Sequence, residues 1–140
     1  MVRAVLDANV LVSAVIVRPG KSGKILRSLH WVQLLISDDI LGEVARVLHY
    51  PRIQKKYSLS EQDITEYLAE LRQRCELVPI RSLIAGVSAD PDDEKYLACG
   101  VDGDADYLVS GDPHLLDIEE YKGIKIVSPS TFLSLFEQEP

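Results

Sequence analysis

The chain has 140 residues, the usual size of one domain, and hydrophobic residues make up 46% of it. Its formal net charge of −7 argues against a protein that binds nucleic acid passively, because such proteins are basic. The charge argues less against a metal-dependent enzyme, whose own site binds cations first. No apolar stretch reaches the length of a membrane span, so we expect no membrane association.

Cysteine usage and the first residues favour a cytoplasmic protein. Cys75 and Cys99 have neither CxxC nor Cys/His spacing, and we interpret them as reduced, partly buried thiols. A strand and an aspartate within the first seven residues argue against a signal peptide.

The chain opens on a predicted buried strand at residues 2–6, which is short, rich in β-formers and nearly continuously apolar. Residues 10–14 are apolar too, and the preceding residues 7–9 can cap a helix. We prefer a helix there, while a second strand remains open. A loop and a helix over residues 22–29 follow.

The middle of the chain repeats the strand-then-helix order. Residues 32–36 are predicted to be a second buried strand, and Ser37 to cap the next helix. That helix has an apolar stripe over residues 40–48 and ends before Pro51. Residues 60–74 form a clear amphipathic helix.

The last part of the chain contains three predicted strands and three predicted helices. The strand at residues 77–80 contains Pro79, which favours the edge of a sheet. Asp90 followed by Pro91 is typical of a helix start. The remaining elements are a helix to about residue 99, strands at 107–110 and 124–127, one helical turn at 113–117 and a closing helix at 128–136. Strands alternating with helices predict an α/β fold with a parallel sheet.

Two acidic residues follow predicted strands directly. Asp7 comes after the first strand, and Asp112 after the strand at residues 107–110. The carboxyl ends of parallel strands share one sheet edge, where α/β proteins place their active sites. Taken alone, each residue is more often a helix cap or a turn residue than a catalytic group.

A third acid, Glu43, shares a helix face with Ile40 and Val47. It therefore borders the apolar stripe and points partly inward. Two interpretations remain open for it: a site residue, or a boundary glutamate whose tip reaches water.

The fourth acid lies in the run Asp90-Pro91-Asp92-Asp93-Glu94, which helix capping alone would explain. Asp93 shares its face with Tyr96 and Leu97, which should pack on the sheet. We therefore predict that Asp93 points at the sheet edge, with Asp92 as the alternative.

Four carboxylates at one edge predict a cation site. Two of them about 4 Å apart repel by ~4 kcal/mol at an effective dielectric near 20. Either some take up protons, or a cation holds them together. Mg²⁺ and Mn²⁺ prefer oxygen ligands, and no His or Cys cluster indicates zinc. A cation with carboxylates and waters suits phosphodiester hydrolysis.

These motifs, together with Ala105-Asp106-Tyr107-Leu108-Val109-Ser110-Gly111-Asp112, resemble the PIN domain, and more narrowly the PIN-family toxins of prokaryotic toxin–antitoxin systems. The resemblance spans almost the whole chain. It implies one domain over residues 1–140, folded as a three-layer α/β/α sandwich with a mostly parallel sheet, similar to flap-endonuclease cores.

The resemblance also implies an activity, which is that of an endoribonuclease dependent on Mg²⁺ or Mn²⁺. Its metal-binding and catalytic roles transfer to Asp7, Glu43, Asp93 and Asp112. Asn9 and Ser110 match polar positions that help place water or substrate. Toxin members are usually homodimers inhibited by an antitoxin, and residues 52–76 are where a helical hairpin for such contacts is expected.

Two other functions remain open. One is a catalytically silent module that works by binding a partner. The other is a phosphohydrolase with Asp7 as nucleophile, which is disfavoured because haloacid-dehalogenase-like enzymes need a second Asp where this chain has Asn9.

Basic clusters and histidines add secondary candidates. A phosphate-backbone track is one interpretation of the basic residues, and a solvated helix face is the preferred one. His114, close to Asp112, is a candidate for contact with substrate. The basic residues are Arg18, Lys21, Lys24, Arg27, Arg52, Lys55 and Lys56.

Overall fold

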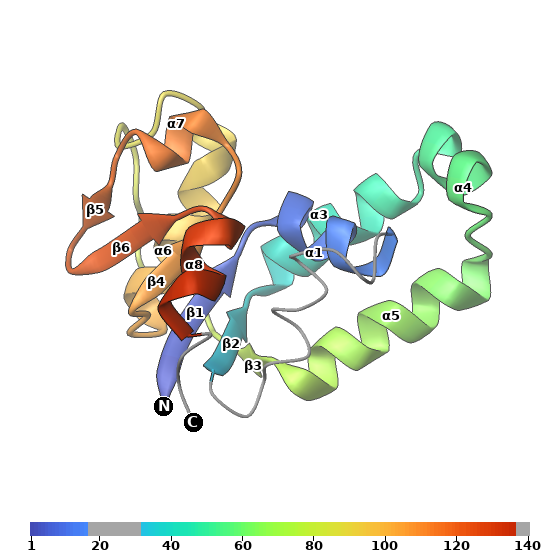
Figure 1. Cartoon of the computed structure of the whole chain (residues 1–140), viewed down its shortest axis with the longest axis horizontal. Coiled ribbons are helices and arrows are strands. Elements are labelled where there is room, and N and C mark those ends of the chain that lie inside the picture. Colours follow the sequence, from blue (N-terminus) through green and yellow to red (C-terminus); the bar gives the residue numbers. More distant parts are fainter. Residues whose placement is uncertain (17–31, 137–140) are drawn as a thin grey trace.

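The computed structural model describes residues 1–16 and 32–136 (Figure 1). The strands are β1 (Val2–Leu6), β2 (Val32–Ile36), β3 (Glu76–Leu77), β4 (Tyr107–Val109), β5 (Glu120–Tyr121) and β6 (Ile124–Val127). The helices are α1 (Ala8–Ile16), α3 (Asp38–Leu48), α4 (Pro51–Tyr57), α5 (Glu61–Arg74), the 3₁₀ turn η1 (Pro91–Asp93), α6 (Glu94–Asp102), α7 (Pro113–Leu116) and α8 (Pro129–Phe136).

The strands form one sheet in the order β3-β2-β1-β4-β6-β5. All neighbours are parallel except β5, which runs antiparallel to β6. The central strand β1 pairs with β2 through Val5 and Leu35, and with β4 through Leu6 and Val109. The predicted mostly parallel sheet is confirmed, and the carboxyl ends of β1, β2 and β4 lie at one edge.

Helices cover the sheet and close the core. Ala4, Val5, Leu108 and Val109 have no exposed surface, as expected for parallel strands buried on both faces. Helix α6 packs against β1, β2 and β4, while α8 lies in front of the sheet in Figure 1. Phe132 of α8 is buried and meets the Tyr107 ring edge-on, with centroids 5.6 Å apart. The predicted α/β/α architecture is confirmed.

Local capping signals account for where α3 and α5 begin. The Ser37 hydroxyl accepts a hydrogen bond from the Ile40 amide at the start of α3. Ser60 and Asp63 form a reciprocal capping box at the start of α5. The predicted starts are confirmed, and residues 8–16 are a helix, so the alternative of a second strand there is wrong.

Several boundaries differ from the prediction for local reasons. Pro51 begins α4, because proline at the first helical position gives up an amide that has no helical partner there. Helix α6 runs three residues past Cys99, to Asp102. The short strand β5 was not predicted, and it returns to β6 through Gly123, whose φ of +82° suits glycine.

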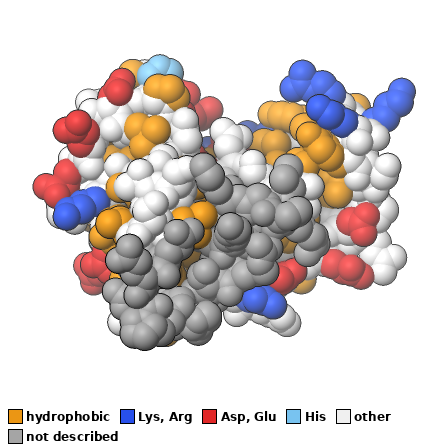
Figure 2. All heavy atoms as spheres, viewed as in Figure 1, with side chains coloured by type: hydrophobic (Ala, Val, Ile, Leu, Met, Phe, Trp, Pro, Cys, Tyr) orange, Lys and Arg blue, Asp and Glu red, His pale blue; other side chains and the backbone are white. Residues whose placement is uncertain are grey.

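Helices α4 and α5 extend away from the sheet as the arm of the molecule (Figure 1). They fill the range in which the helical hairpin was expected. Arg52, Lys55 and Lys56 are exposed on α4, and Figure 2 shows basic side chains gathered at that end. The ring of His49, at the end of α3, lies 2.8 Å from the Glu61 carboxylate and so joins the end of α3 to the start of α5.

Some predictions lie outside the described residues. These are the helix at 22–29 and the basic residues Arg18, Lys21, Lys24 and Arg27. Within residues 1–16 and 32–136, no helix combines the length and apolar character that crossing a lipid bilayer requires.

Candidate metal centre

Asp7 lies at the junction of β1 and α1, and only 2% of its surface is exposed. Its Oδ1 accepts the Val10 amide at 2.8 Å, which makes it the cap of α1. Its Oδ2 accepts a hydrogen bond from the Ser110 hydroxyl. Its own amide donates to the Val109 carbonyl of β4 at 3.1 Å. The same buried carboxylate therefore caps α1 and lies at the sheet edge where the site was predicted.

The environment of Asp7 disfavours its charge. Burial is the main cause that raises its pKa, and the negative charges of Asp112 and Glu43 add to this effect. The hydrogen bonds from Ser110 and Val10 act in the opposite direction and stabilise the ionised form. Two further carboxylates, those of Asp112 and Glu43, therefore repel an ionised Asp7.

Ser110 connects the acids at the ends of β1 and β4. It is fully buried, donates to Asp7, and accepts the Asp112 amide at 2.9 Å. The side chain of Asp112 is 26% exposed and caps α7, accepting the His114 amide at 2.9 Å. Because β1 and β4 are neighbouring parallel strands, Asp7 and Asp112 lie at the same sheet edge, as predicted.

Glu43 approaches from α3 and is held by two consecutive residues of α6. Its side chain is 23% exposed, in agreement with a partly inward position. The Tyr96 hydroxyl donates to Glu43 Oε2 and accepts the Ala8 amide at 3.1 Å. The Lys95 ammonium lies 2.9 Å from the same Oε2. Burial and Glu43 raise the pKa of Tyr96, so the phenol keeps the proton that it donates.

Asp93 ends η1 and is 6% exposed, whereas Asp92 is exposed. The Ser88 hydroxyl donates to Asp93 Oδ2 at 3.1 Å. The Asp92 amide instead donates to Asp90 at 3.0 Å, as part of the cap. The structure therefore turns Asp93, rather than Asp92, into the protein, in agreement with the sequence-based choice.

The pKa of Asp93 is raised to about 6, against an ordinary value of 3.8, and burial is the main cause. The charges of Asp112 and Asp90 contribute to the rise, while Ser88 and His114 act against it. Asp93 thus interacts electrostatically with Asp112, which in turn acts on Asp7. The four predicted acids form one electrostatic group.

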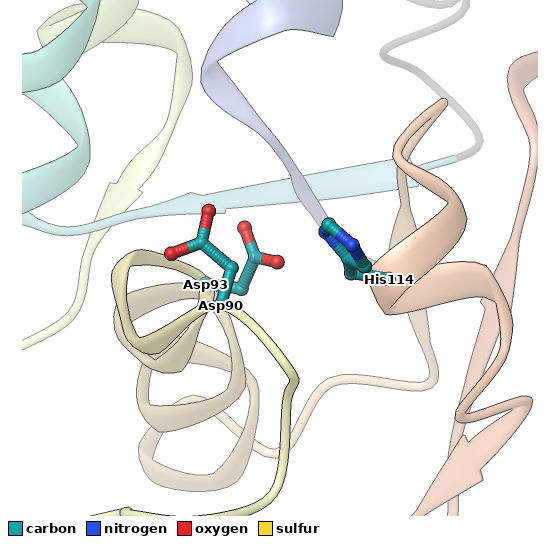
Figure 3. Close-up of side chains that lie close together, drawn as sticks. All are labelled: Asp90, Asp93 and His114. Carbon is teal, nitrogen blue, oxygen red and sulfur yellow. The ribbon is translucent and has the colours of Figure 1, made fainter.

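One close group of potential ligand atoms includes two residues that the sequence analysis did not assign to a metal. In the described part of the chain, carboxylate oxygens of Asp90 and Asp93 and a ring nitrogen of His114 lie within 4.8 Å of one another. Figure 3 shows the carboxylates of Asp90, which precedes η1, and Asp93, which ends it, side by side, with the His114 ring from α7 facing them. Among residues 1–16 and 32–136, Asp7, Glu43 and Asp112 are not part of so close a group.

Comparison with known proteins identifies the family. The sequence model of the PIN domain matches residues 3–114, which is most of the chain. The chain belongs to the PIN domain family. The resemblance drawn from the motifs is thereby confirmed, and PIN domains are generally nucleases. A search of curated proteins found no match.

Two solved structures share the PIN fold. One is PAE2754 from Pyrobaculum aerophilum, with a TM-score of 0.65 and 15% identity over 99% of this chain and 91% of that one. The other is VapBC2 from Rickettsia felis bound to a DNA fragment from their promoter, with a TM-score of 0.60 and 16% identity over 90% of this chain and 98% of that one. At these identities the likeness concerns the fold.

The donor set of this PIN domain fits a divalent cation that prefers oxygen. Asp7 and Asp93 are buried, and each has a pKa raised by burial and by neighbouring acids. Mg²⁺ and Mn²⁺ suit carboxylates and retain water ligands, so carboxylates need not converge on one point to share them. A bound cation would offset the repulsion that the hydrogen bonds of Ser110 and Ser88 only reduce.

The residues that sequence analysis did not assign to the site differ in how far the sequence could have indicated them. Asp90 precedes Asp93 by three positions, which a 3₁₀ turn places on one side, so its spacing was an available signal. Lys95 and Tyr96 gave no such signal, because Glu43 is more than fifty positions away. Asn9 is exposed in the first turn of α1, and its predicted role with water or substrate stays a prediction.

Proposed function

We propose that this PIN domain is an endoribonuclease dependent on Mg²⁺ or Mn²⁺, with Asp7, Glu43, Asp93 and Asp112 as its metal-binding and catalytic residues. The observation that carries the proposal is the buried Asp7 carboxylate, which two other acids of the predicted site repel. Carboxylates perturbed by burial and by neighbouring acids cluster at functional sites. The oxygen donors and the family support the choice of cation and reaction.

The protein's residues divide the work in the proposed reaction. A divalent cation, when bound, lowers the pKa of a coordinated water and offsets charge on the scissile phosphate. Ser110 holds the Asp7 carboxylate in orientation and shields part of its charge. Ser88 does the same for Asp93. Asn9 and Ser110 are the polar residues proposed to place water or substrate.

We further propose that the chain acts as the toxin of a toxin–antitoxin pair in the cytoplasm, as a homodimer. Its likeness to VapBC2, a toxin–antitoxin system, supports this role. The arm formed by α4 and α5 is the surface that we expect to contact an antitoxin or a second copy.

The alternatives are weaker on structural grounds. Both oxygens of Asp7 accept hydrogen bonds and the residue is buried, which leaves it poorly placed as a phosphohydrolase nucleophile. A catalytically silent module gives no reason to keep Asp7 and Asp93, two buried carboxylates whose pKa is raised by burial. Absence of Mn²⁺ binding in calorimetry would favour the silent module.

The deciding experiment is cleavage of single-stranded RNA by the purified chain with Mn²⁺ or with chelator. Asp7→Asn should lower cleavage about 100-fold or more, because even losing an outer partner of a metal ligand costs about 10- to 100-fold. Asp104→Asn is the matched control, since Asp104 is exposed before β4, at the opposite sheet edge, with a φ of 52° that Asn adopts. Undiminished Mn²⁺-dependent cleavage by folded Asp7→Asn would refute the proposal. Cleavage of DNA with the same sequence, measured alongside, tests whether RNA is the substrate.

A further inference from the structure

We propose that Lys95 and Tyr96 set the affinity of Glu43 for a divalent cation in opposite directions. Tyr96 is a positioning residue that fixes the carboxylate for the cation, and Lys95 is an internal cation that competes for the same oxygen. The inference rests on the proposed function, in which Glu43 is a metal ligand.

The position of Tyr96 supports its role in fixing the Glu43 carboxylate. Its hydroxyl joins three elements, since it lies on α6, donates to Glu43 of α3 and accepts the amide of Ala8, the first residue of α1. The ring is buried, with 5% of the residue exposed. Ala8 adjoins Asp7, so one phenol fixes Glu43 relative to the backbone that carries Asp7. Hydrogen bonds of this kind orient metal ligands and strengthen binding.

The ion pair of Lys95 supports its role as a competitor of the divalent cation. Its ammonium lies 2.9 Å from Glu43 Oε2, the oxygen that Tyr96 also contacts, and its side chain is only 16% exposed. It also lies 5.7 Å from the centre of the Tyr96 ring. A divalent cation that uses this oxygen must displace the ammonium or bind beside a positive charge. Either route weakens binding relative to a neutral residue at position 95.

The structure also offers the ammonium another place. A groove of about 300 Å³ between α3 and the start of α6 is lined by Asp39, Arg46, Pro91, Asp92 and Lys95. Two of its lining residues are exposed acids. An ammonium displaced from Glu43 would have space in this groove near Asp39 and Asp92, with the positive charge of Arg46 on the same lining.

The test is calorimetric titration of Mn²⁺ into the full chain and its variants at pH 7.5. Lys95→Gln should bind Mn²⁺ about fivefold more tightly than the unmodified chain, the size expected for losing one partly exposed charge contact. Lys95→Arg should retain the original Kd, because it keeps the charge. Lys125→Gln, which removes the same charge from an exposed position on β6, should leave the Kd unchanged.

Tyr96→Phe removes only the hydroxyl and should weaken Mn²⁺ binding about 10- to 100-fold. Circular dichroism checks that Tyr96→Phe folds. If it does not fold, the Lys95 variants still test the inference. A weaker or unchanged Kd for Lys95→Gln, or an unchanged Kd for folded Tyr96→Phe, overturns the inference alone. No Mn²⁺ binding by the unmodified chain overturns it together with the proposed function.

Discussion

Asp93 allows a direct test of whether the ionised carboxylates of the site lower the stability of the fold. The carboxylate is 6% exposed, and burial together with Asp90 and Asp112 raises its pKa from 3.8 to about 6. Asn has nearly the same shape without the charge. We therefore predict that Asp93→Asn is more stable than the unmodified chain at pH 7 in the presence of a chelator.

The magnitude follows from the pKa. The difference between 3.8 and about 6 corresponds to about 3 kcal/mol at pH 7, taking ~1.4 kcal/mol per pH unit. Screening by nearby water reduces this figure, so we expect a gain of about 1–2 kcal/mol in the free energy of unfolding. For a chain of this size the gain equals a rise in Tm of about 3 to 8 °C.

The pH dependence gives the prediction its sign. Between about pH 4 and pH 6 the folded protein binds more protons at Asp93 than the unfolded chain does, since its folded pKa is about 6. The free energy of unfolding therefore falls as the pH rises through this window. Below about pH 4 Asp93 is protonated in both states, and its destabilising effect disappears. The advantage of Asp93→Asn should be largest at pH 7 and absent near pH 4.

The assay is thermal unfolding followed by circular dichroism at pH 4, 5, 6 and 7 with chelator. Asp92→Asn is the matched control, because Asp92 is an exposed neighbour. Added Mn²⁺ should stabilise the unmodified chain more than Asp93→Asn, since the variant has lost a ligand. A variant that is less stable at pH 7, or whose advantage is the same at pH 4, would refute the reasoning.

Three further predictions follow from named contacts. Mn²⁺ affinity should fall about tenfold between pH 7.5 and pH 5, because the pKa of about 6 for Asp93 lets protons compete with the cation; a flat calorimetric profile would contradict this. Ser110→Ala should lower Mn²⁺ affinity by about tenfold or more, since Asp7 loses the donor that supports its charge; an unchanged Kd would count against the role of Ser110. In urea unfolding, Gly103→Ala should cost about 1–3 kcal/mol, because a Cβ there would lie 2.9 Å from the Cys99 carbonyl oxygen and from Leu35. Gly42→Ala, in α3 with open space around it, should instead stabilise by about 0.5–1 kcal/mol, and equal effects of the two changes would refute this contrast.

Features that depend on near neighbours in the chain were predictable. The apolar run of β1, the Ser37 cap and the start of α5 at Ser60 follow from residues a few positions apart. Asp7 and Asp112 were also within reach, because each directly follows a strand and parallel strands share an edge. Local periodicity further favoured Asp93 over Asp92, and the structure buries Asp93.

What the tertiary structure decided depends on contacts between distant parts of the chain. Ser110 and Asp7 are 103 positions apart, and Tyr96 and Glu43 are 53 apart. Whether two such side chains meet depends on strand order and helix packing, which no local pattern specifies.

The amino-acid sequence by itself thus determined the α/β fold and the family, because these depend on periodicity, caps and motifs, and it predicted which acidic residues form the site. The tertiary structure alone decided that His114 joins Asp90 and Asp93, and that Lys95 and Tyr96 hold Glu43. The physical reason is that hydrogen bonds and ion pairs act over a few ångströms in space, whatever the separation along the chain.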